Sequence, residues 1–135
     1  MLIGGAMRSL AILILLAAGP ATAQEAMTGA AFDAYATGKT LSYRVGTAQP
    51  YGTERYMPDR RVIWTTVNGR CTMGVWFDWE DQICFRYDDD PEDKCWHFYP
   101  DGDALTGFFQ QDFSLASRIA VIDDEELYAC DRLTS

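Results

Sequence analysis

Short apolar runs separated by turn-forming residues occupy most of the chain from Thr40 onward. The runs are rich in β-branched and aromatic residues, which is typical of strands. Their separators include Pro58-Asp59 and Asn68-Gly69, and the second pair is the strongest short-range hairpin signal in the sequence. The pattern predicts strands at Thr40–Val45, Thr53–Met57, Arg61–Val67, Cys71–Trp79, Ile83–Tyr87, Lys94–Tyr99 and Ala104–Phe109, with an eighth at Arg118–Ile122.

The short connections between these strands predict an all-β fold. Seven or eight strands joined in this way form an antiparallel meander, either a small barrel or a two-sheet sandwich. A barrel leaves no exposed edge, which favours it slightly. Before the first strand, Thr28–Ala36 predicts a short helix, with Thr28 as its N-cap and Gly38 as its C-terminal stop. The acidic stretch Asp123–Ala129 is interpreted as a short helix or coil.

The N-terminal residues have the organisation of a secretory signal peptide. Arg8 precedes an unbroken apolar run at Leu10–Ala18, Gly19-Pro20 ends this run, and Ala21-Thr22-Ala23 is a small-x-small cleavage site. The alternative is a membrane anchor, but the run is shorter than the roughly twenty residues that a membrane-spanning helix needs. We therefore expect cleavage after Ala23, a periplasmic or secreted protein, and no membrane span after cleavage.

Residues 24–135 are expected to form a single domain, because about 110 residues can build one hydrophobic core but not two. The chain has 20 Asp and Glu against 11 Lys and Arg, a formal net charge of −9. This acidic charge opposes binding to nucleic acid and to anionic lipid, and it suits a cationic protein partner. It leaves the oligomeric state open.

The cysteines predict disulfides rather than a metal site. All four of them, Cys71, Cys84, Cys95 and Cys130, follow the signal peptide. An even number of cysteines in an exported domain indicates disulfides, and four cysteines allow three pairings. Zinc sites use closely spaced C-x-x-C ligand pairs, which these cysteines do not form.

The segment Gln82–Tyr99 favours one of these pairings. If Cys84 faces Cys95 across an antiparallel pair, the loop Asp88–Pro91 remains, which is an ordinary hairpin length. A slip of one residue would mix the two faces of the hairpin. By subtraction, Cys71 pairs with Cys130. The expected buried face consists of Ile83, Phe85, Tyr87, Trp96 and Phe98, and the opposite face of Cys84, Arg86, Cys95 and His97.

A series of short motifs runs along the middle of the chain. Gly69–Trp76 (GRCTMGVW), Ile83–Tyr87 (ICFRY), Cys95-Trp96 and Gly102-Asp103 follow the scheme G-x-W, I-C-x-x-Y, C-W and G-D. This scheme resembles that of a group of small secreted proteobacterial proteins, catalogued as a domain of unknown function. The resemblance implies a β fold and export. It implies no activity and no site residues, and residues 110–135 have no counterpart in it.

No motif in the chain predicts catalysis, a metal or a cofactor. His97 is the only histidine and has no G-x-S-x-G nucleophile to act with, so we interpret it as exposed or simply hydrogen-bonded. The acidic turn Asp88–Asp93 lacks the spacing of a calcium-binding loop and is interpreted as a solvated hairpin tip. An alternative function is a periplasmic hydrolase that uses surface carboxylates, for which Asp78 and Glu80 are an example of a pair on one strand face.

Aromatic residues are in excess, with four Trp, seven Tyr and seven Phe. Some must fill the core, because a small barrel is packed by its own side chains. Others can line a cup at the barrel mouth, and the candidate ligand-binding residues are Trp64, Trp76 and Trp96. We therefore expect a non-enzymatic exported domain that binds a small ligand or a protein partner. A structural protein of the cell envelope is a further alternative.

Overall fold

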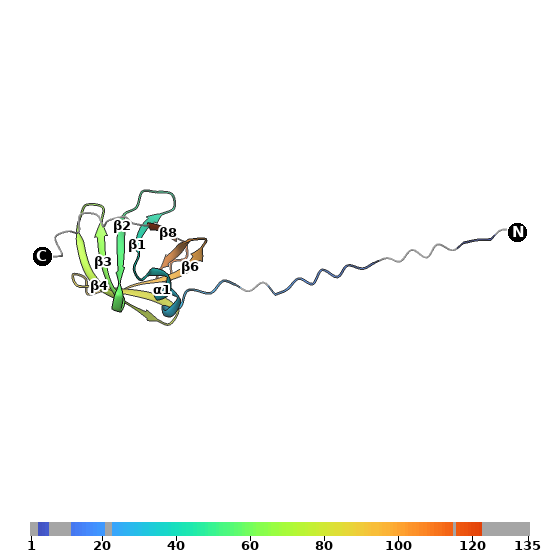
Figure 1. The fold of residues 1–135 in the computed structure, drawn as a ribbon, viewed down its shortest axis with the longest axis horizontal. Helices are drawn as coiled ribbons and strands as arrows, with labels where there is room; N and C mark the ends of the chain where they lie inside the picture. The colour runs from blue at the N-terminus through green and yellow to red at the C-terminus, as the bar shows by residue number, and fades with distance from the viewer. Residues whose placement is uncertain (1–2, 6–11, 21–22, 115, 123–135) are drawn as a thin grey trace.

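The computed structural model describes residues 3–5, 12–20, 23–114 and 116–122 (Figure 1). Eight antiparallel strands follow one another in sequence order, and β8 pairs with β1, so that the sheet closes into a barrel without a free edge. The predicted all-β meander with a short N-terminal helix is therefore confirmed. The strands are β1 Thr40–Val45, β2 Gly52–Met57, β3 Arg61–Thr66, β4 Cys71–Trp79, β5 Gln82–Tyr87, β6 Lys94–Asp101, β7 Ala104–Phe109 and β8 Ala116–Ile122.

Helix α1 (Gly29–Ala36) lies at one end of the barrel, beside the 3-10 turn η1 (Pro58–Arg60) (Figure 1). Thr28 is its N-cap as predicted, because the Ala31 N–H donates a hydrogen bond to the Thr28 hydroxyl at 3.1 Å. Gly38 follows the helix with φ +89°, a conformation that glycine adopts without steric cost and that commonly ends helices.

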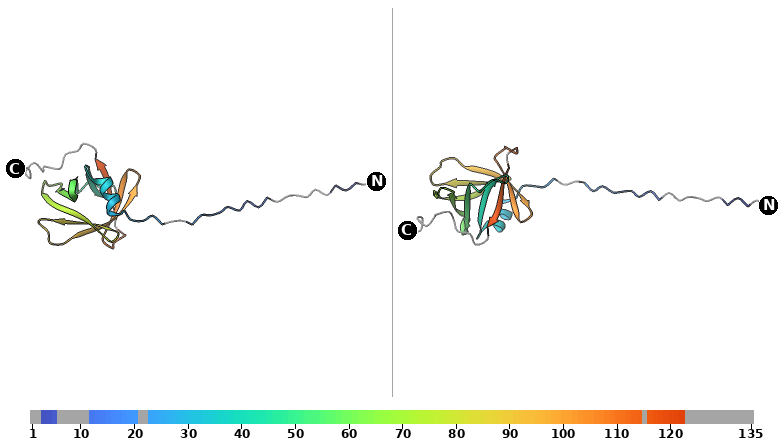
Figure 2. Two further views of the ribbon diagram at one scale, coloured as in Figure 1. Left: turned by 60° about the horizontal axis from the view of Figure 1, so that its bottom comes forward. Right: turned by 90° about the horizontal axis from the view of Figure 1, so that it is seen from above.

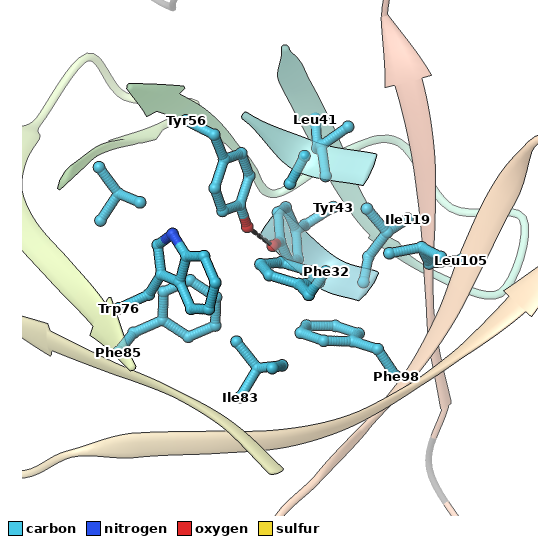
Figure 3. Packing of buried hydrophobic residues seen from close by; sticks show 12 residues of the cluster. Phe32, Leu41, Tyr43, Tyr56, Trp76, Ile83, Phe85, Phe98, Leu105 and Ile119 are labelled. Carbon is cyan, nitrogen blue, oxygen red and sulfur yellow. Dashed lines mark hydrogen bonds between the residues drawn. The ribbon is translucent and has the colours of Figure 1, made fainter. Parts of the chain in front are cut away.

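The helix fills its end of the barrel with an aromatic side chain. Phe32 is fully buried, and its ring stacks on Phe98 at 5.1 Å between ring centroids. It also makes edge-on contacts with Tyr56 and Trp76 (Figure 3). This end of the barrel is therefore solid. The buried core comprises Phe32, Ala36, Leu41, Tyr43, Tyr56, Val62, Trp76, Ile83, Phe85, Phe98, Leu105 and Ile119.

The β5–β6 hairpin has the predicted register. Cys84 pairs with Cys95 in a disulfide with a Cα–Cα distance of 3.9 Å, and Ile83 lies opposite Trp96. Cys71 is disulfide-bonded as well, whereas Cys130, its predicted partner, lies outside the described residues. The predicted helix or coil at Asp123–Ala129 also lies outside them.

The outer face of this hairpin is more buried than the sequence suggests. Cys84 is fully buried, and His97 is also buried, at 4% exposed, so that of the two expected interpretations of His97 the hydrogen-bonded one holds and the exposed one does not. The reason is that the segment after β7 covers this face, with the Phe113 ring 5.0 Å from the His97 ring.

The N-terminal residues 12–20 form neither helix nor strand, and they extend away from the barrel (Figures 1 and 2). Among the described residues, hydrogen bonds to the barrel begin at Gln24, whose side chain donates to the Pro100 carbonyl at 3.2 Å. The Met27 N–H then donates to the Phe98 carbonyl at 2.8 Å. Within the described part of the chain, no helix has the length and apolarity required to cross a bilayer.

Candidate ligand-binding cavity

The barrel is hollow at the end opposite α1. A cavity of about 370 Å³ lies there, lined by side chains from β1 to β7 and by residues of the loops that follow β1, β3 and β5. Its size is within the range of small-molecule sites. Its aromatic wall consists of Tyr43, Tyr51, Trp64, Phe85, Trp96 and Phe109.

The strand register brings the lining of β2 to β4 onto one row. Glu54 of β2 lies opposite Trp64 of β3, and Trp64 lies opposite Thr72 of β4. The lining residue of β1, Tyr43, lies opposite Gly52, two residues before Glu54. Since side chains alternate between the two faces of a strand, this whole row points into the barrel. Gly52 makes room for it, because a Cβ at this position would lie 2.3 Å from the Trp64 indole.

Glu54 forms the floor of the cavity. It is 2% exposed, and the Tyr87 hydroxyl lies 2.9 Å and 2.8 Å from its two carboxyl oxygens. Burial raises the pKa of Glu54 to about 8, although the hydrogen bond from Tyr87 acts in the opposite direction. The carboxyl group is therefore mainly neutral at pH 7. No lysine or arginine among the described residues forms a salt bridge with it.

Three tyrosines surround this carboxyl group, the buried Tyr43 and Tyr56 and the partly buried Tyr87. Tyr43 and Tyr56 share a hydroxyl–hydroxyl hydrogen bond below the cavity (Figure 3), and Tyr87 binds Glu54 directly. Burial is the main cause that raises the pKa of each of these tyrosines above the usual value of a phenol. All three phenols therefore stay neutral, and they form a polar layer between the apolar core and the cavity.

The aromatic rings of the cavity wall meet at steep angles. The Tyr43 and Trp64 rings are 5.3 Å apart at 86°, and Tyr43 and Trp96 are 6.3 Å apart at 64°. Tyr51 lies 5.9 Å from Trp64 at 58°. Rings in such an arrangement present faces and edges from several directions, as in an aromatic cage.

The rim of the cavity is formed by paired charges. Arg70 contacts Asp89 at 2.6 Å, and Lys94 contacts Asp90 at 3.1 Å. The predicted acidic hairpin tip thus borders the cavity, with these carboxylates held in ion pairs. Among the described residues, no group of three or more His, Cys, Asp or Glu side chains could hold a metal ion.

The three tryptophans that the sequence predicts as ligand-binding residues lie in two different regions of the barrel. Trp64 and Trp96 both line the cavity, where they contact Tyr43 from two sides. Trp76 is 1% exposed and packs against Phe32 at 5.1 Å, in the solid end of the barrel. It is therefore a core residue in this structure and does not line the cavity.

His97, Asp78 and Glu80, which the sequence also offers as candidate functional residues, lie outside the cavity. The His97 ring is on the outer face of the barrel, and its Nδ1 is hydrogen-bonded to the Gln110 carbonyl at 2.8 Å. Asp78 forms a salt bridge with Arg60 at 2.6 Å, and Glu80 lies just beyond β4 with φ +55°. Asp78 and Glu80 are at the helix end of the barrel, so they form no joint site with Glu54.

Glu54 itself was missed by the sequence analysis. The sequence does contain a signal for it, because Glu54 lies two residues before Tyr56. Residues two apart on a strand share a face, and a tyrosine is an expected core residue, so Glu54 is expected to face inward as well. An acidic residue on a core-facing position is unusual, and such positions are often functional.

Comparisons with known proteins identify no relative. No family model, curated protein or solved structure matches the chain. The resemblance to small secreted proteobacterial proteins therefore stays a prediction, and function has to be inferred from the cavity itself.

Proposed function

We propose that this protein is an exported, non-enzymatic binding protein that holds a small, largely apolar molecule in the open end of its barrel. The observation that carries the proposal is the cavity of about 370 Å³, with its aromatic wall and its single buried carboxyl group at the floor. Small-molecule sites share this combination of a mainly apolar lining with a few placed polar groups.

The hydrolase alternative has less support. Asp78 is held by Arg60, and Glu80 is exposed beyond the end of β4, and neither lines the cavity at the open end of the barrel. Glu54 faces the cavity, but the other two carboxylates of the lining, Asp89 and Asp90, are held in ion pairs at the rim, so it has no second free carboxylate among the described lining residues to act with. The arrangement is suited to holding a ligand.

Export is part of the proposal. The apolar residues Ile12, Leu13, Ile14, Leu15 and Leu16 are 79–90% exposed, which is unfavourable for a segment that stays on a protein in water. Hydrogen bonds to the barrel begin at Gln24 in the described part of the chain, so cleavage after Ala23 would leave the domain intact. The Cys84–Cys95 disulfide also suits an oxidising compartment such as the periplasm or the extracellular space.

Native mass spectrometry of protein purified from the envelope or medium of its own host tests this function. We expect a mass that begins at Gln24, two disulfides and a non-covalent adduct that denaturation removes. A Trp96→Ala variant should lose the adduct, whereas Trp79→Ala should keep it, because Trp79 is 57% exposed and does not line the cavity. An adduct that both variants retain, or a wild-type protein that binds no small molecule in this assay and in titrations, would contradict the proposal.

A further inference from the structure

We propose that the ligand of this cavity is an organic ammonium ion with a compact apolar body, and that Glu54 is its counter-ion. This inference rests on the proposed function and adds the chemical class of the ligand. Three features support it: a buried carboxyl group with no described cationic partner, a cage of aromatic rings around the space above it, and an acidic protein surface.

The first feature is the isolation of Glu54. The titratable side chains that interact with it are phenols, namely Tyr43, Tyr51, Tyr56 and Tyr87. Burying a carboxyl group in such surroundings is costly unless a charge or hydrogen bonds compensate for it. A ligand with an ammonium group would supply the charge that the described residues do not.

The basic side chains nearest to the cavity already form salt bridges. Arg70 and Lys94 line its rim, where they pair with Asp89 and Asp90. The rim is therefore locally balanced and leaves the floor carboxyl group as the one unpaired acid among the described lining residues. An anionic ligand would find no free basic side chain among these lining residues to pair with.

The second feature is the cage. Tyr43, Tyr51, Trp64 and Trp96 line the space above Glu54 with centroid distances of 5.3–6.4 Å between neighbouring rings. The face of an aromatic ring carries partial negative charge and attracts ammonium groups within about 6 Å. The apolar body of the ligand would gain from burial against the same rings.

The third feature is the negative electrostatic potential that the net charge of the whole protein creates. A formal net charge of −9 raises the local concentration of small cations and lowers that of anions. Entry of a cationic ligand is therefore favoured, and its on-rate should fall as salt is added.

Binding of an ammonium ion should release a proton. In the free protein Glu54 holds its proton at pH 7, because burial raises its pKa to about 8. The ammonium ion favours the carboxylate, so the carboxyl proton leaves for solvent while the ligand keeps its own. The affinity should therefore rise about 50-fold between pH 6 and pH 8, following the ionised fraction of Glu54, and level off above pH 9.

The test is isothermal titration calorimetry with a matched panel of probes. Phenethyl, indolylethyl and decyl groups are each presented with an ammonium, a hydroxyl or a carboxylate. We expect the amines to bind at least tenfold more tightly than the alcohols at pH 8. Titrations at pH 7 in buffers of different ionisation enthalpy should show the release of about one proton per amine bound.

Glu54→Gln is the diagnostic variant, and Glu80→Gln is its matched control at the other end of the barrel. Glu54→Gln should abolish the preference for amines and the proton release while keeping the binding of alcohols, and Glu80→Gln should change neither. If Glu54→Gln does not fold, the proton release and pH profile of the wild-type protein decide the question.

Equal or tighter binding of alcohols or carboxylates would overturn the inference and leave the proposed function standing, and so would amine binding without proton release. If no member of the panel binds, the proposed function and the inference both fail.

Discussion

The Tyr87 hydroxyl on β5 meets both carboxyl oxygens of Glu54 on β2, at 2.8 Å and 2.9 Å. These strands are not neighbours in the sheet, so the contact spans the interior of the barrel. It marks the boundary between the solid end, which Phe32 fills, and the hollow end, which the aromatic wall surrounds. The Glu54–Tyr87 pair is therefore expected to affect both the stability of the fold and the binding of a ligand.

Glu54 should make the protein less stable as the pH rises. Its folded-state pKa of about 8 lies above the ordinary value of 4.5, so its contribution is fully present below pH 4.5 and is lost as the pH rises through 8. The free energy of unfolding of the wild type, relative to Glu54→Gln, should fall by on the order of 4 kcal/mol between pH 5 and pH 9. Urea denaturation of both proteins at several pH values measures this difference, and parallel pH profiles would contradict the prediction.

Tyr87→Phe should destabilise the protein by about 1–2 kcal/mol, because it leaves a buried carboxyl group without its donor. It should also raise the pKa of Glu54 further, since this hydrogen bond lowers that pKa. Denaturation measures the first effect, and ¹³C NMR titration of the Glu54 carboxyl carbon measures the second. Tyr99→Phe is a matched control, with its hydroxyl group outside the cavity. Equal effects of the two variants would show that the contact contributes nothing specific.

Gly52→Ala should destabilise the barrel by about 1–3 kcal/mol, because its new methyl group would overlap the Trp64 indole. A double-mutant cycle with Trp64→Ala isolates the cause. If the clash is responsible, Gly52→Ala should cost much less in the Trp64→Ala background, as measured by chemical denaturation. Additive effects would place the cause in the second close contact of the new Cβ, with the Thr65 carbonyl oxygen of β3 at 2.9 Å, which Trp64→Ala does not remove.

Replacing Cys84 and Cys95 together by alanine should lower the free energy of unfolding by about 3 kcal/mol. This is the value that the chain-entropy model assigns to a crosslink with a sequence separation of 11 residues. Denaturation of the double variant without added reductant measures the effect and leaves the disulfide of Cys71 intact. An unchanged midpoint and slope would mean that the hairpin is equally restricted in the unfolded chain.

Local chemistry determined most of the fold. The bounds of β1, β4 and β7 agree with those expected from the sequence, and β6 and β8 are longer than expected. The Thr28 cap and the pairing of Cys84 with Cys95 also follow from short-range patterns. The reason is that strand alternation, turn residues and helix caps depend on neighbours in the sequence.

Only the tertiary structure decided where the site lies. The period of two in a strand tells which face a residue is on, but it does not tell how far along the barrel axis the residue lies. Trp76 and Trp96 both face inward, yet one packs against Phe32 and the other lines the cavity, because α1 fills one end of the barrel and leaves the other hollow. Glu54 became a floor residue for the same reason, since its hydrogen-bond partner Tyr87 comes from β5, which only closure of the sheet brings across the barrel from β2.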